Sequence, residues 1–410
     1  MIKQYKDGTI IERYEVEDAL GFIESYWPKL TRNPVTTNTT LVKLPNPYVV
    51  PSAGNDHFAF QEQYYWDSYF SAIGIRDEKL VTGMLENLIY LFEKFGLIPN
   101  ANRYYFTSRS QPPILTTFIF HVYDTYNKSD HWLQKNMEVA MREYHEVWLS
   151  HEHPHDRAVY MGLSRYYDIN YLHDLAEAES GWDMTPRFKR QCLDYLPIDL
   201  NCLLYKYESD FARAAEIAGK ESEARVWHYA AHERQKAVTK LMWSKRSNFF
   251  FDYNYHEQKR GSVWSLAAYY AMWSGLATHE QARKMVKNLD KFDKKGGLTA
   301  TAGLFMYPSL FGSTKTQWAH PNGWAPLQYF TVEGLERYGY SDEAERQAKK
   351  WLKTCNDWYL HRDEFLEKYN VVNPKLPPVE GVYPSQTGFG WTNGVFVALA
   401  EKYIPKTTDS

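Results

Sequence analysis

Residues 81–96 read VTGMLENLIYLFEKFG, and this stretch carries the pattern that decides the fold class. Val81, Met84 and Leu88 lie three to four residues apart, and further large apolar residues continue the series, so they share one face of a helix. Gly96 ends the series and is the residue type that most often follows a helix. The stretch therefore predicts an amphipathic helix with one buried face.

The same helical spacing recurs on both sides of this stretch. Ser129 and Asp130 begin a second helical pattern, and Ser341 opens another. Thr278 and Gln281 have the spacing of a capping box ahead of a further helix. Since there is no Pro/Ser-rich linker and no series of alternating strands, we expect an all-α protein of about a dozen helices. We expect residues 1–410 to form a single domain, with 1–55 an N-terminal segment of weaker pattern.

Long loops rich in proline, glycine, asparagine and aromatic residues separate the helical stretches. They span 99–113, 179–197, 303–326 and 367–391. Loops of this length are uncommon in compact proteins unless they have a function. A carboxylate or an amide lies beside an aromatic residue in nearly all of them, which is the composition that a sugar site needs. The aromatic residues make up 17% of the chain, and residues of this kind lie more often in a protein core than at a ligand site.

Charge and composition exclude several classes of partner. Lys and Arg total 47 against 50 Asp and Glu, a formal charge of -3, so we expect neither nucleic acid nor an anionic membrane as a partner. A neutral small molecule suits this balance better. The first residues lack the apolar core of a signal peptide, and no stretch of about 18 apolar residues follows, so we expect a cytoplasmic protein without a membrane span. Cys192, Cys202 and Cys355 lack metal-site spacing and predict packed thiols.

No metal or cofactor is expected. Residues 151–156, HEHPHD, resemble a metal cluster, but Pro154 interrupts any helix there and the spacing fits neither HExxH nor a zinc finger. The sequence has no GxxxxGK[ST] and no GxGxxG after a strand, so nucleotide chemistry has no support. We expect a monomer or a small homo-oligomer.

Asp183 and Glu367 are the candidate catalytic pair, because glycoside cleavage needs one protonated and one ionised carboxyl. Asp183 follows a glycine and an indole, and partial desolvation there would raise its pKa as a general acid requires. An alternative with equal weight is that Asp183 caps a helix at 184–186. For Glu367 the alternative is an ordinary solvated surface pair with Lys368.

Two longer blocks, FQEQYYWDSY at 60–69 and QWAHPNGWAP at 317–326, resemble the two signatures of the trehalases of glycoside hydrolase family 37. Shorter blocks agree with the same family: IPNANR at 98–103, RSQPP at 109–113, ESGWD at 179–183, PIDLN at 197–201, EKY at 367–369 and GFGWTNG at 388–394. The likeness spans about residues 58–400. It implies an (α/α)6 barrel, a toroid of helices that acts on an α-glucoside with inversion.

The resemblance also assigns roles. The aspartate of the GWD block, Asp183, is implied to be the general acid, and the glutamate of the EKY block, Glu367, the base that activates water. The residues implied or expected to bind the substrate are Phe60, Tyr64, Trp66, Asp67, Asn100, Arg109, Gln111, Gly181, Gln317, Trp318 and Trp391.

The chain departs from the family where the family holds the leaving glucose. Ala59 stands seven residues before the signature tryptophan, where trehalases have an arginine, and the family's second arginine has no counterpart between Arg165 and Glu179. Val382 replaces a glutamate, and Ala319 replaces the aspartate of the second signature. Charge-assisted hydrogen bonds of this kind are each worth about 1.5–3 kcal/mol, so their loss predicts a changed preference for the leaving group.

The sequence therefore leaves several substrates open. Trehalose is one; glucosylglycerol, glucosylglycerate and mannosylglycerate are alternatives with a smaller leaving group. A glycerate would need a cation, for which Arg109 and Arg187 are candidates. A non-catalytic sugar-binding protein is the alternative of another class, and the presence of both carboxyls disfavours it.

Overall fold

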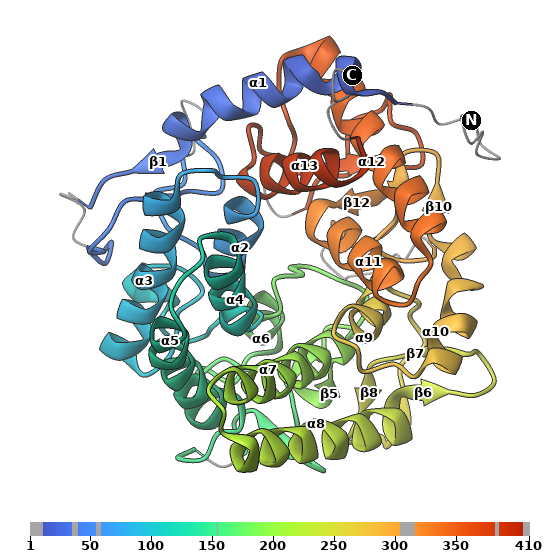
Figure 1. Ribbon diagram of the computed structural model, residues 1–410. Coiled ribbons are helices and arrows are strands. Elements are labelled where there is room, and N and C mark those ends of the chain that lie inside the picture. The colour runs from blue at the N-terminus through green and yellow to red at the C-terminus, as the bar shows by residue number, and fades with distance from the viewer. Residues whose placement is uncertain are drawn as a thin grey trace.

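The computed structural model describes residues 11–34, 40–54, 59–153, 155–303, 316–381 and 385–404. Figure 1 shows two concentric rings of helices. The inner helices are α2 (Tyr65–Ala72), α4 (Leu115–Thr125), α7 (Ile198–Ile217), α9 (Tyr270–Trp273), α11 (Ala325–Arg337) and α13 (Gly390–Tyr403). The outer helices are α1 (Arg13–Leu30), α3 (Glu78–Phe95), α5 (Asp130–Arg142), α8 (Glu221–Met242), α10 (His279–Val286) and α12 (Ser341–Arg362). The short α6 (His173–Glu179) lies in the connection to α7.

Burial distinguishes the two rings. All eight residues of α2 are buried, whereas only seven of the 22 residues of α8 are. A helix that is buried all round belongs in a protein interior, and a helix with one buried stripe covers it from outside. This alternation of inner and outer helices confirms the all-α class and the (α/α)6 barrel that the resemblance implied.

The predicted helix ends are confirmed. Gly96 follows α3 in the left-handed conformation, with a φ of 73°, and the Ser129 hydroxyl accepts a hydrogen bond from the α5 backbone. Thr278 and Gln281 form the capping box of α10, and Ser341 is the first residue of α12.

The ring closes where α13 packs against α2, and glycines allow that contact. A Cβ at Gly394 would lie 1.9 Å from the carbonyl oxygen of Phe70, and one at Gly74 would lie 2.5 Å from the Cα of Gly394. Only residues without a side chain permit backbones to approach this closely. The first and last inner helices in chain order are therefore joined by direct backbone contact.

Short antiparallel strands, which the sequence pattern did not predict, tie the loops together. Their pairs are β1 (Thr31–Arg32) with β2 (Tyr48–Val49), β3 (Ala158–Tyr160) with β4 (Leu163–Ser164), β6 (Trp243–Ser244) with β7 (Phe249–Phe250), β10 (Asp293–Lys294) with β11 (Gly297–Leu298), and β12 (Asn322–Trp324) with β13 (Lys368–Asn370). β8 (Tyr253–Asn254) lies between β5 (Tyr195–Leu196) and β9 (Lys259–Arg260). Two or three alternating residues are too few to stand out in a sequence.

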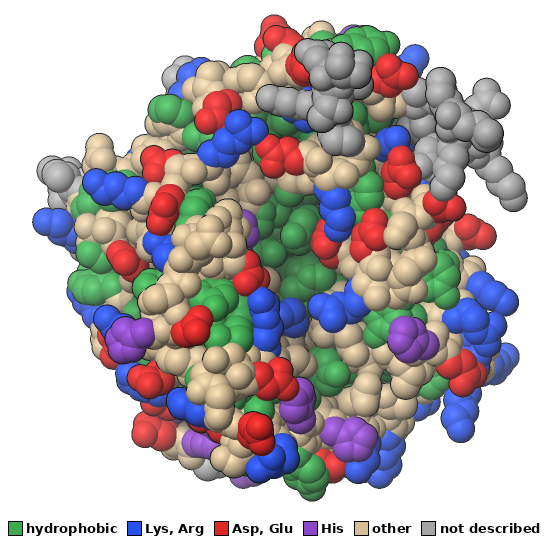
Figure 2. Space-filling model, in the orientation of Figure 1, with side chains coloured by type: hydrophobic (Ala, Val, Ile, Leu, Met, Phe, Trp, Pro, Cys, Tyr) green, Lys and Arg blue, Asp and Glu red, His purple; other side chains and the backbone are tan. Residues whose placement is uncertain are grey.

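The surface of one face is hollowed at the centre of the ring. Figure 2 shows hydrophobic side chains at the floor of this hollow and charged side chains around its rim. Among the described residues, no helix combines the length and the apolar character needed to cross a membrane. Cys192, Cys202 and Cys355 are free, buried thiols, as expected.

Candidate active site

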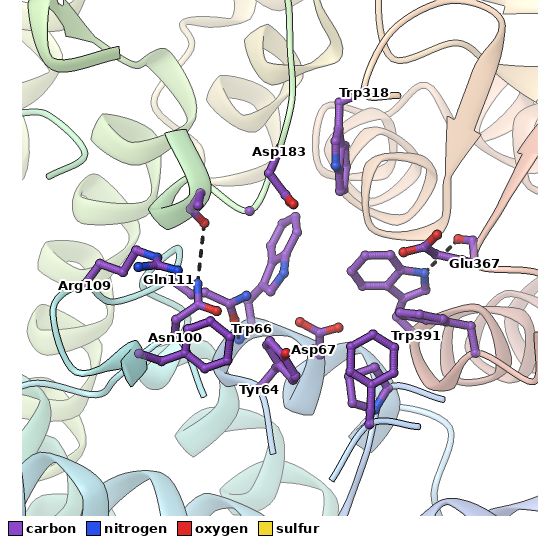
Figure 3. A pocket seen from close by; sticks show the side chains of 16 residues that line it. Tyr64, Trp66, Asp67, Asn100, Arg109, Gln111, Asp183, Trp318, Glu367 and Trp391 are labelled. Carbon is purple, nitrogen blue, oxygen red and sulfur yellow. Dashed lines mark hydrogen bonds between the residues drawn. The ribbon is translucent and has the colours of Figure 1, made fainter. Parts of the chain in front are cut away.

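A cavity of about 300 Å³ lies where the connections into the inner helices converge (Figure 3). Its lining consists of Pro51, Phe60, Tyr64, Trp66, Asp67, Asn100, Phe106, Arg109, Gln111, Ala178, Gly181, Asp183, Trp318, Glu367, Phe389 and Trp391. Most of these residues lie in the connections that enter α2, α4, α7, α11 and α13 or in the first turn of those helices. Residues far apart in the sequence therefore meet at one end of the barrel.

The cavity brings together both predicted catalytic residues and ten of the eleven predicted binding residues. The exception is Gln317, which lies behind Asp183 rather than in the lining. Sequence reasoning missed Pro51, Phe106, Ala178 and Phe389. Phe389 lies inside the GFGWTNG block, and Phe106 lies between the IPNANR and RSQPP blocks, so both could have been found by extending those blocks.

The backbone around Asp183 is fixed on three sides. The Gln317 amide donates a hydrogen bond of 2.5 Å to the Asp183 carbonyl, and the Trp318 N–H donates one of 3.2 Å to the Met184 carbonyl. The Thr185 N–H donates one of 2.6 Å to the buried Glu177 carboxylate. Residues 184–186 are not helical, so the alternative that Asp183 caps a helix there is wrong.

The environment of Asp183 favours its neutral form. Its pKa is raised from 3.8 to about 7, chiefly because the carboxyl is buried and also because the charge of Glu367 is nearby. A carboxyl with this pKa still carries a proton near neutral pH, which is what a general acid needs.

Glu367 is held next to a short strand. Lys368, Tyr369 and Asn370 form β13, in which Lys368 pairs with Trp324 of β12. The indole N–H of Trp391 donates a hydrogen bond of 2.9 Å to the Glu367 carbonyl. These contacts orient the Glu367 carboxylate toward the cavity (Figure 3).

The Lys368 ammonium donates a 2.6 Å hydrogen bond to Oε2 of Glu367. Both side chains are buried, so the alternative of a solvated surface pair is wrong. The same ammonium lies 5.0 Å from the centre of the Trp324 ring, a cation–π contact. Glu367 therefore has an opposite charge at hydrogen-bond distance inside the protein.

A third carboxyl, Asp67 in the first turn of α2, lines the same cavity. Its pKa rises from 3.8 to about 8, chiefly because it is buried and also because the charges of Glu367 and Asp183 repel a further charge. Gln111 contacts Asp67 and donates to it, while its own oxygen accepts the Trp66 backbone N–H at 3.1 Å.

Tryptophan side chains form the apolar part of the wall. Trp318 stacks on Trp324 with ring centres 3.7 Å apart, and the edge of Trp66 faces Trp391 at 6.0 Å. Gly181 has a φ of +71°, and a Cβ there would lie 2.8 Å from the Trp66 ring, so only glycine fits. This wall excludes water and causes the desolvation that raises the pKa of Asp183.

The two candidate cations for a glycerate differ in position. Arg109 lines the cavity, and its guanidinium lies 3.3 Å from Asp168. Arg187 is fully buried and forms ion pairs with Asp199 at 2.5 Å and with Asp252 at 2.7 Å, so the suggestion that it could bind a substrate carboxylate is wrong.

Two of the three residues that replace family residues, Ala59 and Ala319, lie in the described part of the chain. Ala59 is exposed and Ala319 is buried, whereas Val382 lies outside the described residues. Pro154 of the HEHPHD stretch also lies outside them. Within the described ranges, no group of three or more His, Cys, Asp or Glu side chains is arranged to hold a metal ion.

Comparisons with known proteins place the chain in a family. A family model described as Trehalase matches residues 2–172 and 167–403. A probable trehalase of Eremothecium gossypii is 32% identical over 442 aligned positions, which cover 89% of this chain but only 58% of that protein.

Solved structures agree in fold. Neutral trehalase Nth1 of Saccharomyces cerevisiae is similar with a TM-score of 0.75 at 32% identity, over 87% of this chain and 73% of that one. A GH63 mannosylglycerate hydrolase from Thermus thermophilus, solved in complex with glucose, has the same fold with a TM-score of 0.69 at 15% identity, over 93% of this chain and 99% of that one. Matched by the family model along nearly its whole length, the chain belongs to the trehalase family of glycoside hydrolases.

Proposed function

We propose that this protein hydrolyses a small α-glucoside with inversion, with Asp183 as general acid and Glu367 as general base. The observation that carries the proposal is the contrast between two carboxyls facing one cavity. Asp183 has a pKa raised to about 7, whereas Glu367 lies 2.6 Å from a buried ammonium. Two carboxyls with opposite protonation preferences are the requirement for this reaction.

The chemistry follows from these preferences. Asp183 gives its proton to the glycosidic oxygen as the bond from that oxygen to the anomeric carbon breaks. Glu367 removes a proton from a water molecule whose oxygen bonds to the anomeric carbon from the opposite face. The net reaction consumes one water, releases the leaving group as an alcohol and gives the β-sugar. Asp183 then regains a proton, and Glu367 loses one, by exchange with solvent.

The remaining lining residues suit the cleaved sugar. Asp67, Asn100 and Gln111 offer hydrogen-bonding groups, and the indole of Trp66 offers an apolar face. A protonated Asp67 can donate as well as accept a hydrogen bond, which matches the dual character of a sugar hydroxyl. Gln317 acts indirectly, because its amide holds the Asp183 backbone.

Trehalose is the first candidate substrate, since the relatives with 32% identity are named as trehalases. Glucosylglycerol, glucosylglycerate and mannosylglycerate stay alternatives because Ala59 and Ala319 replace residues of the family's signatures. The glycerates are disfavoured by the ion pair between Arg109 and Asp168 and by the burial of Arg187. The cytoplasmic location and the oligomeric state stay predictions.

Assay of the purified protein against these four compounds tests the proposal, with the anomer of the first product followed by NMR. We expect the cleaved sugar to appear as its β-anomer; from trehalose the leaving glucose keeps its α-configuration, so the two anomers should appear in equal initial amounts. Initial release of the α-anomer alone would contradict inversion. Asp183→Asn and Glu367→Gln should each lose at least about a hundredfold in kcat. Asp363→Asn is the matched control, because Asp363 is exposed and has a φ of 55°, which asparagine tolerates.

The same experiment distinguishes the alternative class. A non-catalytic sugar-binding protein would bind glucose in calorimetry and turn over none of the four compounds. Near-full activity of both carboxyl variants would instead refute the assigned roles.

A further inference from the structure

A line of aromatic rings leads from the cavity to the surface. Phe106 lines the cavity, and its ring centre lies 5.8 Å from that of Tyr64, which also lines it. Phe106 also contacts its chain neighbour Tyr105, with ring centres 4.5 Å apart. Tyr105 is 62% exposed. The three rings therefore form a continuous path from inside the cavity to solvent.

An arginine that is itself in an ion pair contacts each of the two outer rings, Phe106 and Tyr105. The Arg109 guanidinium lies 5.3 Å from the Phe106 ring centre, and it is itself bound to Asp168. The Arg103 guanidinium lies 5.5 Å from the Tyr105 ring centre and is buried in an ion pair with Glu62. A single exposed tyrosine is common on protein surfaces. One that is fixed by a buried arginine and continues a cavity wall is better explained as a binding surface.

The adjoining loop extends the same surface. The Ile169 N–H donates a hydrogen bond of 3.1 Å to the Ser108 carbonyl, so this loop lies against the segment that carries Phe106. Ile169 is 70% exposed and Tyr171 is 61% exposed. The exposed apolar side chains beside the cavity therefore come from two connected loops.

The volume of the cavity indicates which part of a substrate would contact the Tyr105 side chain. Ligand pockets typically span about 300–1,000 Å³, so a cavity of about 300 Å³ is at the small end of this range and suits one sugar unit. The second half of a larger substrate would then extend along the exit from the cavity.

We propose that the Tyr105 ring, which continues the cavity wall beyond Phe106 at an angle of 62°, is a platform on which the leaving group stacks, so that this enzyme recognises a leaving group by its ring rather than by its charge. The inference rests on the proposed hydrolysis of α-glucosides. The apolar face of a pyranose or aryl ring stacks on such a surface, whereas an open-chain group has no face to offer. The absence of the arginine at Ala59 fits recognition without charge. The enzyme then accepts aryl α-glucosides as well as a disaccharide.

Steady-state kinetics of the full chain test the platform. The substrates are trehalose, 4-nitrophenyl α-glucoside and methyl α-glucoside. Only methyl α-glucoside has a leaving group without a ring, and its affinity is measured as KM or as a competitive Ki. We expect Tyr105→Ala to raise KM for the two ring-bearing compounds about three- to tenfold relative to methyl α-glucoside. Tyr105→Phe keeps the ring and should restore the wild-type ratio. Tyr14→Ala is the matched control, since Tyr14 is 73% exposed on α1.

The outcomes distinguish failure of the proposed hydrolysis from failure of the proposed platform. If the wild type hydrolyses none of the compounds in the assay panels, the proposed function is overturned. If it cleaves trehalose but not the aryl glucoside, or if Tyr105→Ala weakens all three compounds equally, only the platform is overturned. An equal effect on all compounds is what a purely structural role of Tyr105 would give.

Discussion

Replacing Lys368 by methionine removes the buried cation beside the proposed base. The Lys368 ammonium lies 2.6 Å from Glu367, and both side chains are buried. At that distance, and with an effective dielectric constant near 20, the attraction amounts to about 6 kcal/mol. Desolvation offsets part of it, and removing one partner of a buried pair typically costs about 3–5 kcal/mol. We expect Lys368→Met to lose stability of that size at pH 7.5.

The stability lost in Lys368→Met should depend on pH, because the Glu367 carboxylate stays buried after the ammonium is removed. An ionised carboxylate without the ammonium is costly, and lowering the pH neutralises it, so the loss of stability should shrink toward pH 4. Loss of the ammonium should also move the acidic limb of kcat/KM to higher pH in Lys368→Met, and Lys368→Arg, which keeps a cation, should move it less.

Urea denaturation and a pH–rate profile measure both effects. The matched control is Lys402→Met: the Lys402 ammonium also lies 2.6 Å from a carboxylate, that of Glu333, but these side chains are 40% and 27% exposed. Lys402→Met should lose no more than about 1 kcal/mol of unfolding free energy. The double variant with Glu367→Gln should recover much of the stability lost in Lys368→Met. Equal losses for the two lysines with an unchanged acidic limb would refute the reasoning.

Three further predictions concern Asp183, Gly181 and Gly394. The pKa of Asp183 is raised from 3.8 to about 7, so the wild type loses stability as the pH rises through that window. Asp183→Asn should therefore be more stable than the wild type by up to about 4 kcal/mol at pH 8, but not at pH 4. Urea denaturation at both pH values measures the difference. Gly181→Ala should reduce kcat/KM at least about tenfold, because the φ of +71° strains any side chain and an indole lies 2.8 Å from the added Cβ, so the loop of Asp183, the proposed acid, is displaced. Wild-type kinetics would contradict this. Gly394→Ala should cost about 3 kcal/mol or more, because its Cβ would meet a carbonyl at 1.9 Å, whereas Gly21→Ala has nothing within 4 Å and should gain up to about 1 kcal/mol in thermal denaturation.

Local features of the structure were predictable from the sequence. The helix over residues 81–96, the capping box at Thr278 and the start at Ser341 depend on neighbouring residues, so a linear pattern is enough to find them. The loop blocks likewise named most of the cavity lining, because each block contributes whole short segments to it.

What the sequence could not predict depends on contacts across long separations. Glu367 followed by Lys368 has the composition of a solvated surface pair, and only pairing with Trp324 buries it. Arg187 looked available because its partner Asp252 lies 65 residues away in the chain. Gln317 was expected to touch the substrate, but its amide bonds to the backbone of Asp183, 134 residues earlier.

The contact between α2 and α13 has a consequence for how the protein could be used. Trp66 and Trp391 face each other across this seam, and Asp183 and Glu367 lie on opposite sides of the exposed turn at Gly219. A chain cut at that turn would give two fragments, each with one of the two carboxyls proposed to be catalytic, and neither fragment would contain the whole cavity lining. Turnover would return only when the fragments reassemble the complete ring, which makes this barrel a suitable frame for a split-enzyme reporter of association.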